Sequence, residues 1–500
     1  MAAATLAAAL LRGFHLGRQS LWIDEVLTWY SAGIGVPLAW RDVLENVHGP
    51  LYSLVLHAWG ACAGDSEWAL RLPSALFGTA LVPVTAWLAA RWLGRETATG
   101  AAWLTAGSPF LVWYSQEARN YSLVMLCACL SCVALLSLRR APGAGRVTGY
   151  LAAAGAGLLS NFTFAFLLPL HVRWWLGEPE GRGRRLVALL AASLALVLLV
   201  LPWAPQAARI LDWHRLHPGG APQSSATPLR GSTTFHPAAV PFTAYSFAVG
   251  YTLGPSLREL RADSSAGALL RHAPAIAAVA LVFGPLGILG VRALRRRRKI
   301  GEVALWLGLP ILVVSYFALR NFKVFHPRYL AVVYPCFVLL LAVALADLGP
   351  RARRAVAAAI GLLWAVSLHH HYFVPRYGKE DLRGAAALVR ARGVVGEKLL
   401  AVNTGEPMFY YYRGPLPQGR LWLGYAGDPV RLERRLSEAL AGVSGAWVVL
   451  SRAEDLDPSG AFVRYVDRRF PGAERTRLEG VRVWHIRLPN HGRSGAAGSS

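Results

Sequence analysis

Long apolar stretches recur along most of this 500-residue chain, and they constrain its fold more than any other feature. A helix needs about 20 mostly apolar residues to cross a lipid bilayer. The stretches that we expect to be spanning helices are 71–93, 97–114, 120–138, 186–203, 272–292, 302–319, 329–346 and 355–371. The apolar stretch 147–176 is interrupted by Ser160-Asn161, which predicts two short spans, and Met1–Leu11 predicts one further short helix. The sequence therefore predicts a polytopic α-helical membrane protein with about eleven spans.

Composition agrees with this class and excludes others. Hydrophobic residues make up 54% of the chain and charged residues 16%, whereas about 25% of an ordinary soluble protein is charged. A disordered chain would lack the apolar residues, and 5 cysteines in 500 residues give no disulfide framework. The net charge of +24 is compatible with nucleic acid, an anionic membrane surface or phosphate-bearing substrates as partners.

Much of the positive charge lies between the predicted spans. The connections 91–96, 139–146, 173–185, 292–299 and 347–354 together hold 18 Lys or Arg residues. They are every second connection, which is typical of cytoplasmic loops. We therefore expect a multi-pass protein of the cell inner or plasma membrane, with its N-terminus in the cytoplasm. The long connections 12–70 and 204–271 and the C-terminal region are expected on the extracytoplasmic side, and no nucleic-acid partner is indicated.

The composition changes near residue 376, where alternating patterns predict a small α/β domain. The expected helices are 379–392 and 428–442, and the expected strands are 398–402, 445–450 and 480–487. We expect a membrane domain over residues 1–375, with 12–70 as its first outer loop, and an extracytoplasmic α/β domain over 376–489. The tail 490–500 is expected to be disordered.

The first outer loop mixes Trp and Leu with carboxylates at amphipathic spacing, which predicts helices lying in the membrane interface. Asp24 and Glu25 follow the first apolar helix and are flanked by Trp22 and Trp29. An acidic pair in a loop is usually a solvated surface feature. A partly shielded carboxylate at the membrane boundary can instead act as a general base, and these surroundings favour that function.

Six segments carry a family resemblance. They are LWIDEVLTWYS, HGPLYSLVLHAW, GDSEWALRLPSALFG, SPFLVWYSQEARNYSL, YSFAVGYTLGPSLREL and FHPRYLAVVYP. In this order they resemble the membrane-bound glycosyltransferases with the GT-C fold, in the bacterial branch related to protein O-mannosyltransferases and the lipid A aminoarabinose transferase. The resemblance covers roughly residues 10–390. It departs from the usual HPPLY pattern at Gly49, within HGPLY.

The resemblance implies transfer of a sugar from a polyprenyl-phosphate donor to an extracytoplasmic glycan, lipid or protein acceptor, with inversion at the anomeric carbon. Asp24 matches the catalytic aspartate of the family, and Glu25 is expected to orient acceptor or sugar. Cations suit the leaving lipid phosphate, and the candidates are Arg119, Lys323, His326 and Arg328. Further expected substrate-binding residues are His48, Tyr52, Arg71, Tyr114, Gln116, Glu117, Tyr121 and Tyr329.

The short turn around Gln116, Glu117 and Arg119 is the least ordinary of these candidates. A plain turn favours Gly, Asn or Pro, so large polar side chains there point to function. Arg328 ends a span on the side that the charge rule disfavours, but a snorkelling Arg is the alternative. Arg71 is as compatible with anchoring its helix as with a site.

The sequence indicates no metal site and no required cofactor. His48 is isolated, and the consecutive His369, His370 and His371 would point in three directions on a helix. Two rival functions remain: a transporter or flippase for lipid-linked or anionic substrates, and a non-catalytic membrane scaffold. A transporter is typically marked by inverted repeats and ionisable residues in mid-membrane, and neither is evident here.

Overall fold

The structure, a computed structural model, describes residues 1–33, 49–141, 143–177, 182–205, 235–263, 265–320, 325–402, 405–421, 429–457 and 459–488. It divides into two compact units. The first unit comprises Met1–Gly17, Thr28–Pro255 and Leu269–Phe373. The second comprises Arg18–Leu27, Ser256–Ala268 and Val374–Ser500. The second unit is therefore assembled from three segments that lie far apart in the sequence.

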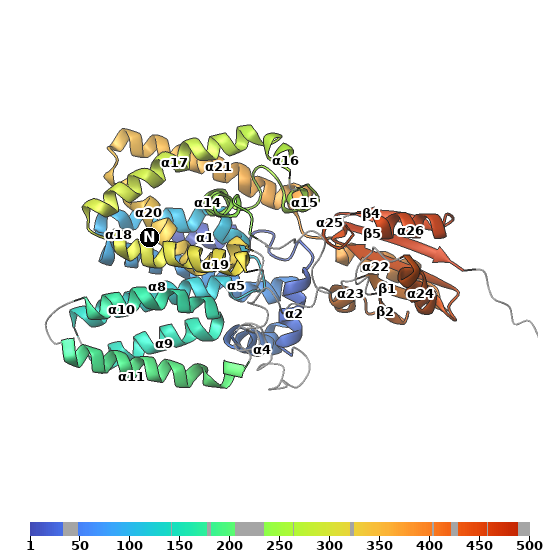
Figure 1. The fold of residues 1–500 in the computed structure, drawn as a ribbon, viewed down its shortest axis with the longest axis horizontal. Helices are drawn as coiled ribbons and strands as arrows, with labels where there is room; N and C mark the ends of the chain where they lie inside the picture. The colour runs from blue at the N-terminus through green and yellow to red at the C-terminus, as the bar shows by residue number, and fades with distance from the viewer. Residues whose placement is uncertain are drawn as a thin grey trace, which may run out of the picture. The chain divides into compact units, whose positions relative to one another are not determined.

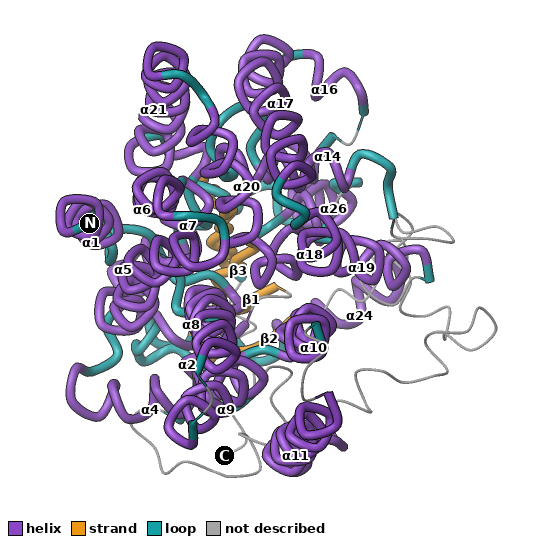
Figure 2. The backbone as a smooth tube through the Cα atoms, turned by 90° about the vertical axis from the view of Figure 1, so that its left-hand side faces the viewer, coloured by secondary structure: helices purple, strands orange, loops and turns teal. Residues whose placement is uncertain are grey.

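The first unit is helical (Figure 1). Its α-helices are α1 (Ala2–Gly13), α4 (Leu51–Ala63), α5 (Glu67–Trp92), α6 (Ala98–Gly107), α7 (Pro109–Ser115), α8 (Tyr121–Arg140), α9 (Ala144–Ser160), α10 (Leu168–Leu176), α11 (Arg182–Val200), α14 (Ala239–Val249), α17 (Ala273–Arg296), α18 (Ile300–Val303), α19 (Leu309–Leu319), α20 (Tyr334–Asp347) and α21 (Pro350–Phe373). Short 3₁₀ or π segments are η1 (Arg95–Thr97), η2 (Phe162–Leu167), η3 (Leu201–Trp203), η5 (Ala304–Gly308) and η6 (Pro327–Val333). Figure 2 shows α5, α8 and α9 next to one another, and α8 packs against both neighbours.

Six helical segments among the described residues are long and apolar enough to cross a membrane. They are Glu67–Trp92, Tyr121–Arg140, Leu186–Trp203, Ala273–Arg296, Ile300–Leu319 and Pro327–Asp347. Each overlaps a stretch that the sequence predicts to span. The structure thus confirms a mostly helical chain with several apolar helices, while the total of about eleven spans stays a prediction.

The stretch 97–114, expected as one span, is two helices. The chain leaves the helical path at Ser108, between α6 and α7. Pro109 has no backbone N–H and cannot continue the hydrogen-bond ladder of α6. The Ser108 hydroxyl accepts a hydrogen bond from Leu111 N at 3.2 Å, so it caps the new helix. The break expected at Ser160-Asn161 is present, because α9 ends at Ser160.

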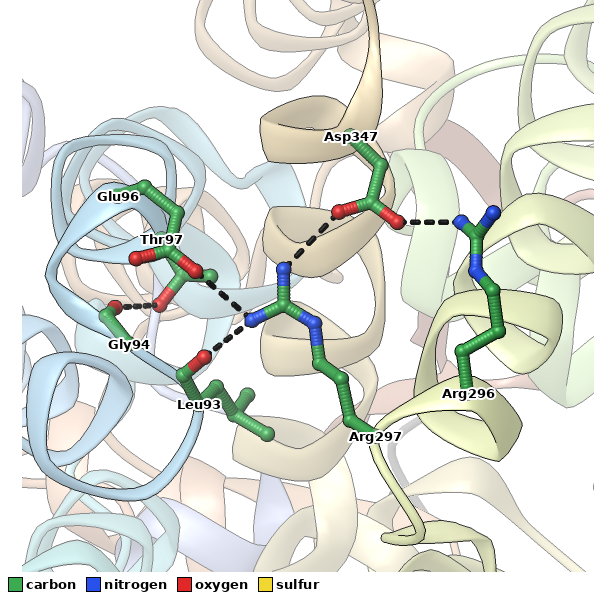
Figure 3. Close-up of polar contacts among 7 residues, drawn as sticks. All are labelled: Leu93, Gly94, Glu96, Thr97, Arg296, Arg297 and Asp347. Atoms are coloured by element: carbon green, nitrogen blue, oxygen red, sulfur yellow. Dashed lines mark hydrogen bonds and ion pairs between the residues drawn. The ribbon is translucent and has the colours of Figure 1, made fainter.

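Arg297 joins the end of α17 to two other helix ends (Figure 3). Its guanidinium donates to Glu96 Oε1 at 2.8 Å, to Asp347 Oδ1 at 2.9 Å and to the carbonyl oxygen of Leu93. Arg296 donates to the other oxygen of Asp347 at 2.6 Å. The planar fork of arginine makes several such bonds at once, so this cluster fixes the ends of α5, α17 and α20 together.

The second unit contains the small sheet domain expected near the C-terminus. Its strands are β1 (Glu397–Val402), β2 (Gln418–Leu421), β3 (Gly445–Ser451), β4 (Glu474–Leu478) and β5 (Val481–Arg487). Its helices are α15 (Leu257–Ala262), η7 (Pro375–Tyr377), α22 (Leu382–Arg392), α23 (Gly405–Tyr411), α24 (Pro429–Leu440), α25 (Ala453–Leu456) and α26 (Ala461–Arg469). Two helices have residues in both units, α2 (Ile23–Ser31) and α16 (Ala266–Leu270).

The sheet order is β2-β1-β3-β5-β4, with β1, β2 and β3 parallel and β5 antiparallel to β3 and to β4. One face packs on α24 and α26 through residues such as Leu436 and Phe462. The other face packs on α22 and α23 through residues such as Val389 and Met408. Helices on both faces explain why β1 and β3 are nearly continuous apolar runs, which the sequence pattern detected.

Acidification tests the Arg297 cluster. A hydrogen bond from a backbone N–H and the bond from Arg297 hold the pKa of Glu96 below its ordinary value of 4.5. A carboxylate whose pKa is depressed by folding stabilises the fold above its ordinary pKa, and that contribution is lost as the pH falls through the folded value. We expect Glu96→Gln to lower the midpoint of thermal unfolding at pH 6. The difference from wild type should shrink below about pH 4.5, and a constant difference would contradict this assignment.

Candidate active site

The acidic pair lies in the first turn of α2, where negative charge stabilises a helix N-terminus. Asp24 is half-buried, whereas Glu25 is completely buried. The carboxylate of Glu25 accepts a hydrogen bond from Lys379 Nζ at 2.8 Å and one from Trp22 N at 3.3 Å, both at Oε2. This geometry favours a supporting role for Glu25 and leaves Asp24 as the better candidate for contact with a substrate.

Within the second unit, hydrogen bonds join the segment before Asp24 to the C-terminal part of the chain. The backbone N–H of Leu21 donates to Tyr411 Oη at 2.6 Å. The hydroxyl of Ser20 donates to Asp381 Oδ1 at 3.4 Å and accepts from Arg383 N at 3.2 Å. The position of α2 in this unit is therefore determined partly by residues more than 350 positions later in the sequence.

In the first unit, Arg119 lies in the buried turn between α7 and α8. Its guanidinium donates to Thr28 Oγ1 at 2.7 Å. Its carbonyl oxygen accepts from Ser74 Oγ at 2.9 Å, and Ser74 Oγ is 2.7 Å from Tyr52 Oη. Within this unit, the Arg119 turn is thus tied to Thr28 and to Ser74 of α5.

Gln116, in the same turn, uses its side chain to hold helix ends. Its amide nitrogen donates to the carbonyl oxygens of Arg12 at 3.0 Å and Phe14 at 2.7 Å, at the end of α1. Its amide oxygen lies 2.8 Å from Nε2 of His371, near the end of α21. These contacts give Gln116 a structural role, which is to hold the ends of α1 and α21. Its predicted contact with substrate stays a prediction.

An aromatic group surrounds the turn. Tyr114 Oη lies 2.8 Å from Tyr251 Oη, and the rings of Tyr114 and Tyr121 pack edge to face with centroids 4.7 Å apart. Burial raises the pKa of Tyr251, and the hydrogen bond from Tyr114 lowers it. The nearby Glu117 carboxylate raises the pKa of Tyr251 and the Arg328 guanidinium lowers it, so both charged groups act on this hydroxyl. Tyr114 thus contacts both Tyr121 and Tyr251.

The expected span 329–346 begins in the 3₁₀ segment η6, which contains the last four residues of FHPRYL, and its α-helix α20 starts only at Tyr334. His326 accepts a hydrogen bond from Arg328 N at its Nδ1, 3.2 Å away, and so caps the segment. The guanidinium of Arg328 lies over the ring of Tyr329, 5.2 Å from its centroid, and donates to Tyr329 Oη at 3.3 Å. Arg328 and Tyr329 are only half-buried, so they remain accessible to a ligand.

The remaining candidates are Arg71, His48 and Lys323. Arg71 is buried in α5 and donates to the carbonyl oxygen of Leu16 at 3.0 Å, which supports the anchoring alternative. His48 and Lys323 lie outside the described residues. Within the part of the chain that the structure describes, no group of three or more His, Cys, Asp or Glu side chains could hold a metal ion.

Comparison with known proteins identifies the fold. Residues 47–205 match the family model described as dolichyl-phosphate-mannose-protein mannosyltransferase. The structure of ArnT from Cupriavidus metallidurans bound to undecaprenyl phosphate matches with a TM-score of 0.59 and 16% identity, covering 98% of each chain. The chain has the GT-C fold. No curated protein sequence matches the chain.

Two further structures share this GT-C fold. ArnT from Cupriavidus metallidurans in the apo state matches with a TM-score of 0.58 and 15% identity over 97% of each chain. Archaeal oligosaccharyltransferase AglB from Archaeoglobus fulgidus, in complex with an inhibitory peptide and a dolichol-phosphate, matches with a TM-score of 0.52 and 13% identity. That match covers 98% of this chain and 74% of AglB. The resemblance that the sequence motifs predict, to GT-C glycosyltransferases related to protein mannosyltransferases, is confirmed.

Sequence reasoning missed three residues that this GT-C chain uses in these clusters: Thr28, Tyr251 and Lys379. Thr28 lies within LWIDEVLTWYS and Tyr251 within YSFAVGYTLGPSLREL, so both occur in segments that carry the resemblance. A threonine or a tyrosine does not by itself suggest a function, and the partners Arg119 and Tyr114 become evident only in the structure. Lys379 had one available signal, because only 4 of the 52 basic residues are lysines.

The role of Gln116 can be tested by unfolding. We expect Gln116→Leu to destabilise the protein by about 1–3 kcal/mol, because it leaves buried carbonyl oxygens at the end of α1 without their donor. Gln418→Leu is the matched control, since Gln418 is exposed and donates to the carbonyl oxygen of Tyr412 at 3.1 Å. The measurement is the midpoint of thermal unfolding in detergent. Equal midpoints for the two variants would exclude a structural role for Gln116.

Proposed function

We propose that this protein is an integral-membrane glycosyltransferase that moves a sugar from a polyprenyl-phosphate donor to an acceptor outside the cytoplasm, with inversion. The observation that carries the proposal is the position of Asp24, a half-buried carboxylate in the first turn of α2 beside the buried Glu25. In the first unit, Arg119 lies in a buried turn and donates to Thr28 Oγ1 at 2.7 Å. A carboxylate and a guanidinium are two groups that this reaction needs.

The comparisons support the donor class. One similar structure holds undecaprenyl phosphate and another holds a dolichol-phosphate, both of them polyprenyl phosphates. The matched family is described by a donor of the same class, dolichyl-phosphate-mannose. The match and the GT-C fold together favour a lipid-phosphate sugar over a nucleotide sugar.

Asp24 is the proposed general base. It would take the proton of the acceptor hydroxyl as that oxygen attacks the anomeric carbon from the face opposite the phosphate. The new glycosidic bond forms while the bond between the anomeric carbon and the phosphate oxygen breaks, which inverts the configuration. Asp24 is half-buried, and partial shielding of this kind tunes a carboxylate for proton transfer.

The leaving lipid phosphate carries its own negative charge and needs cations in place of an acid. Arg119 and Arg328 are the proposed cations, with Lys323 and His326 as further candidates. Guanidinium groups suit this function because they donate two parallel hydrogen bonds to a phosphate. Glu117, Tyr114 and Tyr251 are proposed to contact the sugar or its phosphate, and Tyr114 Oη lies 2.8 Å from Tyr251 Oη.

We further propose that the N-terminus is cytoplasmic and that the α/β domain over residues 376–489 lies outside the cytoplasm, as part of a multi-pass inner or plasma membrane protein. The distribution of 18 Lys and Arg residues over alternate connections supports this orientation. Asp24, Arg119 and Arg328 then all fall in outer connections or at their borders. The substrates would meet them at the outer surface of the membrane.

Replacement of Asp24 tests the base. We expect Asp24→Asn to abolish sugar transfer while the protein stays folded, because an amide cannot accept the proton. Asp65→Asn, in the same outer connection, removes an equal charge and should keep full transfer. The measurement is consumption of donor by purified protein from a panel of polyprenyl-phosphate-linked hexoses and pentoses. Unchanged transfer by Asp24→Asn would refute this mechanism.

Replacement of Arg328 tests the donor phosphate contact. We expect Arg328→Ala to raise the KM for the polyprenyl-phosphate sugar about tenfold or more, and to change the KM for the acceptor much less. Arg271→Ala is the control, since Arg271 is an exposed arginine of an outer connection. Steady-state kinetics at varied donor concentration measure the effect, and an unchanged donor KM would remove Arg328 from the phosphate site.

A further inference from the structure

We propose that Lys379 is a positioning residue of this active site. Its ammonium group holds the carboxylate of Glu25, and this ion pair keeps the neighbouring Asp24 correctly placed and ionised for its work as a base. The inference rests on the proposed function of Asp24 and extends it. It makes the C-terminal α/β domain a part of the catalytic machinery, because Lys379 belongs to the start of that domain and to the same unit as Asp24.

The ion pair is buried. Nζ of Lys379 lies 2.8 Å from Glu25 Oε2, and the two side chains are 9% and 0% exposed. Nζ also lies over the ring of Trp22, 6.0 Å from its centroid, which is within the range of a cation–π contact. A surface ion pair of this length would be weak, but a buried pair cannot lose one partner without leaving an uncompensated charge in a poorly solvated place. Because the pair is buried, replacement of Lys379 should have a large effect on Glu25 and on the segment that carries it.

The backbone at Lys379 is itself held by two other segments. The N–H of Lys379 donates to Gln19 Oε1 at 3.2 Å. The carbonyl oxygen of Gly378 accepts from Arg258 Nη2 at 2.7 Å, and Arg258 also binds Glu479. Residues from all three segments of the second unit thus fix the position from which the lysine reaches Glu25. A contact held in this way suits a positioning residue.

The electrostatic consequence falls on Asp24. With Lys379 present, Glu25 is neutralised and Asp24 has no uncompensated carboxylate beside it. Without the ammonium, the negative charge of Glu25 would stand uncompensated beside the proposed base. We therefore expect the acidic limb of the pH–rate profile to move to higher pH.

In the second unit, other charged groups near Lys379 and residues 18–27 form ion pairs or hydrogen bonds of their own. Arg258 binds Glu479, Arg261 lies 4.0 Å from Glu380, and Arg376 lies 3.9 Å from Glu259. Asp381 accepts from Ser20 and from Gly384 N, Arg383 donates to the carbonyl oxygen of Arg18, and Tyr411 accepts from Leu21 N. Lys379 contacts the acidic pair directly, through the carboxylate of Glu25, so its removal should change the pH profile.

Four variants test the inference: Lys379→Met, Lys379→Arg, the double variant Glu25→Gln/Lys379→Met, and Lys398→Met as the matched control. Lys398 is a lysine of β1 that donates to the carbonyl oxygen of Ala439 at 3.2 Å, far in sequence from the acidic pair. The readouts are the pH dependence of donor consumption, with the polyprenyl-phosphate sugar that the wild type uses, and hydrogen exchange of residues 18–27.

We expect Lys379→Met to reduce transfer at pH 7 at least tenfold and to shift the acidic limb upward by about one pH unit. Lys379→Arg should keep the wild-type limb because it keeps the charge, and the double variant should return the limb toward wild type because it removes both charges. A wild-type limb in Lys379→Met, or a double variant no better than the single one, would overturn the inference.

Hydrogen exchange separates this inference from the proposed function. Failure of the wild type to consume any polyprenyl-phosphate sugar would refute the proposed function alone. In the same proteins, Lys379→Met should accelerate exchange in residues 18–27, and Lys398→Met should leave it unchanged. Unchanged exchange in Lys379→Met would show that the lysine does not hold the Asp24 segment, whatever the activity.

Discussion

The fully buried guanidinium of Arg12, at the end of α1, is the contact on which the helical unit depends. Arg12 donates to the carbonyl oxygens of Thr105 and Ala106 at 2.9 Å each, and to Ser115 Oγ at 3.2 Å. These carbonyls belong to the last turn of α6, which lacks partners within the helix because the chain breaks before Pro109. One side chain thus compensates the break that separates α6 from α7.

The break and its compensation determine where the polar turn lies. Because α7 is a separate short helix, its end places Gln116, Glu117 and Arg119 between helices and not along a straight span. The close packing also needs Gly78 on α5, since a Cβ at that position would lie 2.0 Å from Ser115 Oγ. Gln116 then binds the end of α1 that Arg12 has anchored. The polar residues of this turn therefore differ in their contacts: Gln116 binds helix ends, whereas Arg119 binds Thr28.

Sequence patterns predict the parts of this fold that depend on local periodicity. The apolar helices, the break at Ser160 and the strands β1, β3 and β5 were all predictable, because each carries a long apolar run or a clear interruption of one. The strands β2 and β4 were not, since QGRL and ERTRL lie at the sheet edges and have little apolar character. The split at Ser108 was missed because apolar residues continue across it, although Pro109 was a visible signal.

The candidate site is less predictable than the fold for a different reason. Asp24, Arg119 and Arg328 were recognisable because their residue types and segments resemble a family. Their supports were not, because Ser74, Tyr251 and Lys379 act through partners that lie far away in the sequence. The pairing of Glu25 with Lys379 joins residues 354 positions apart, and no periodicity or motif encodes it.

The same long-range contacts suggest a supporting role for the C-terminal domain. A domain appended to a membrane enzyme could be an accessory that binds acceptor or partner and is otherwise dispensable. Here residues 18–27 form one compact unit with that domain and are held to it by Asp381, Tyr411 and Lys379. If Asp24 is the base, the domain is required to keep the base in place, and its loss would remove catalysis along with any recognition function.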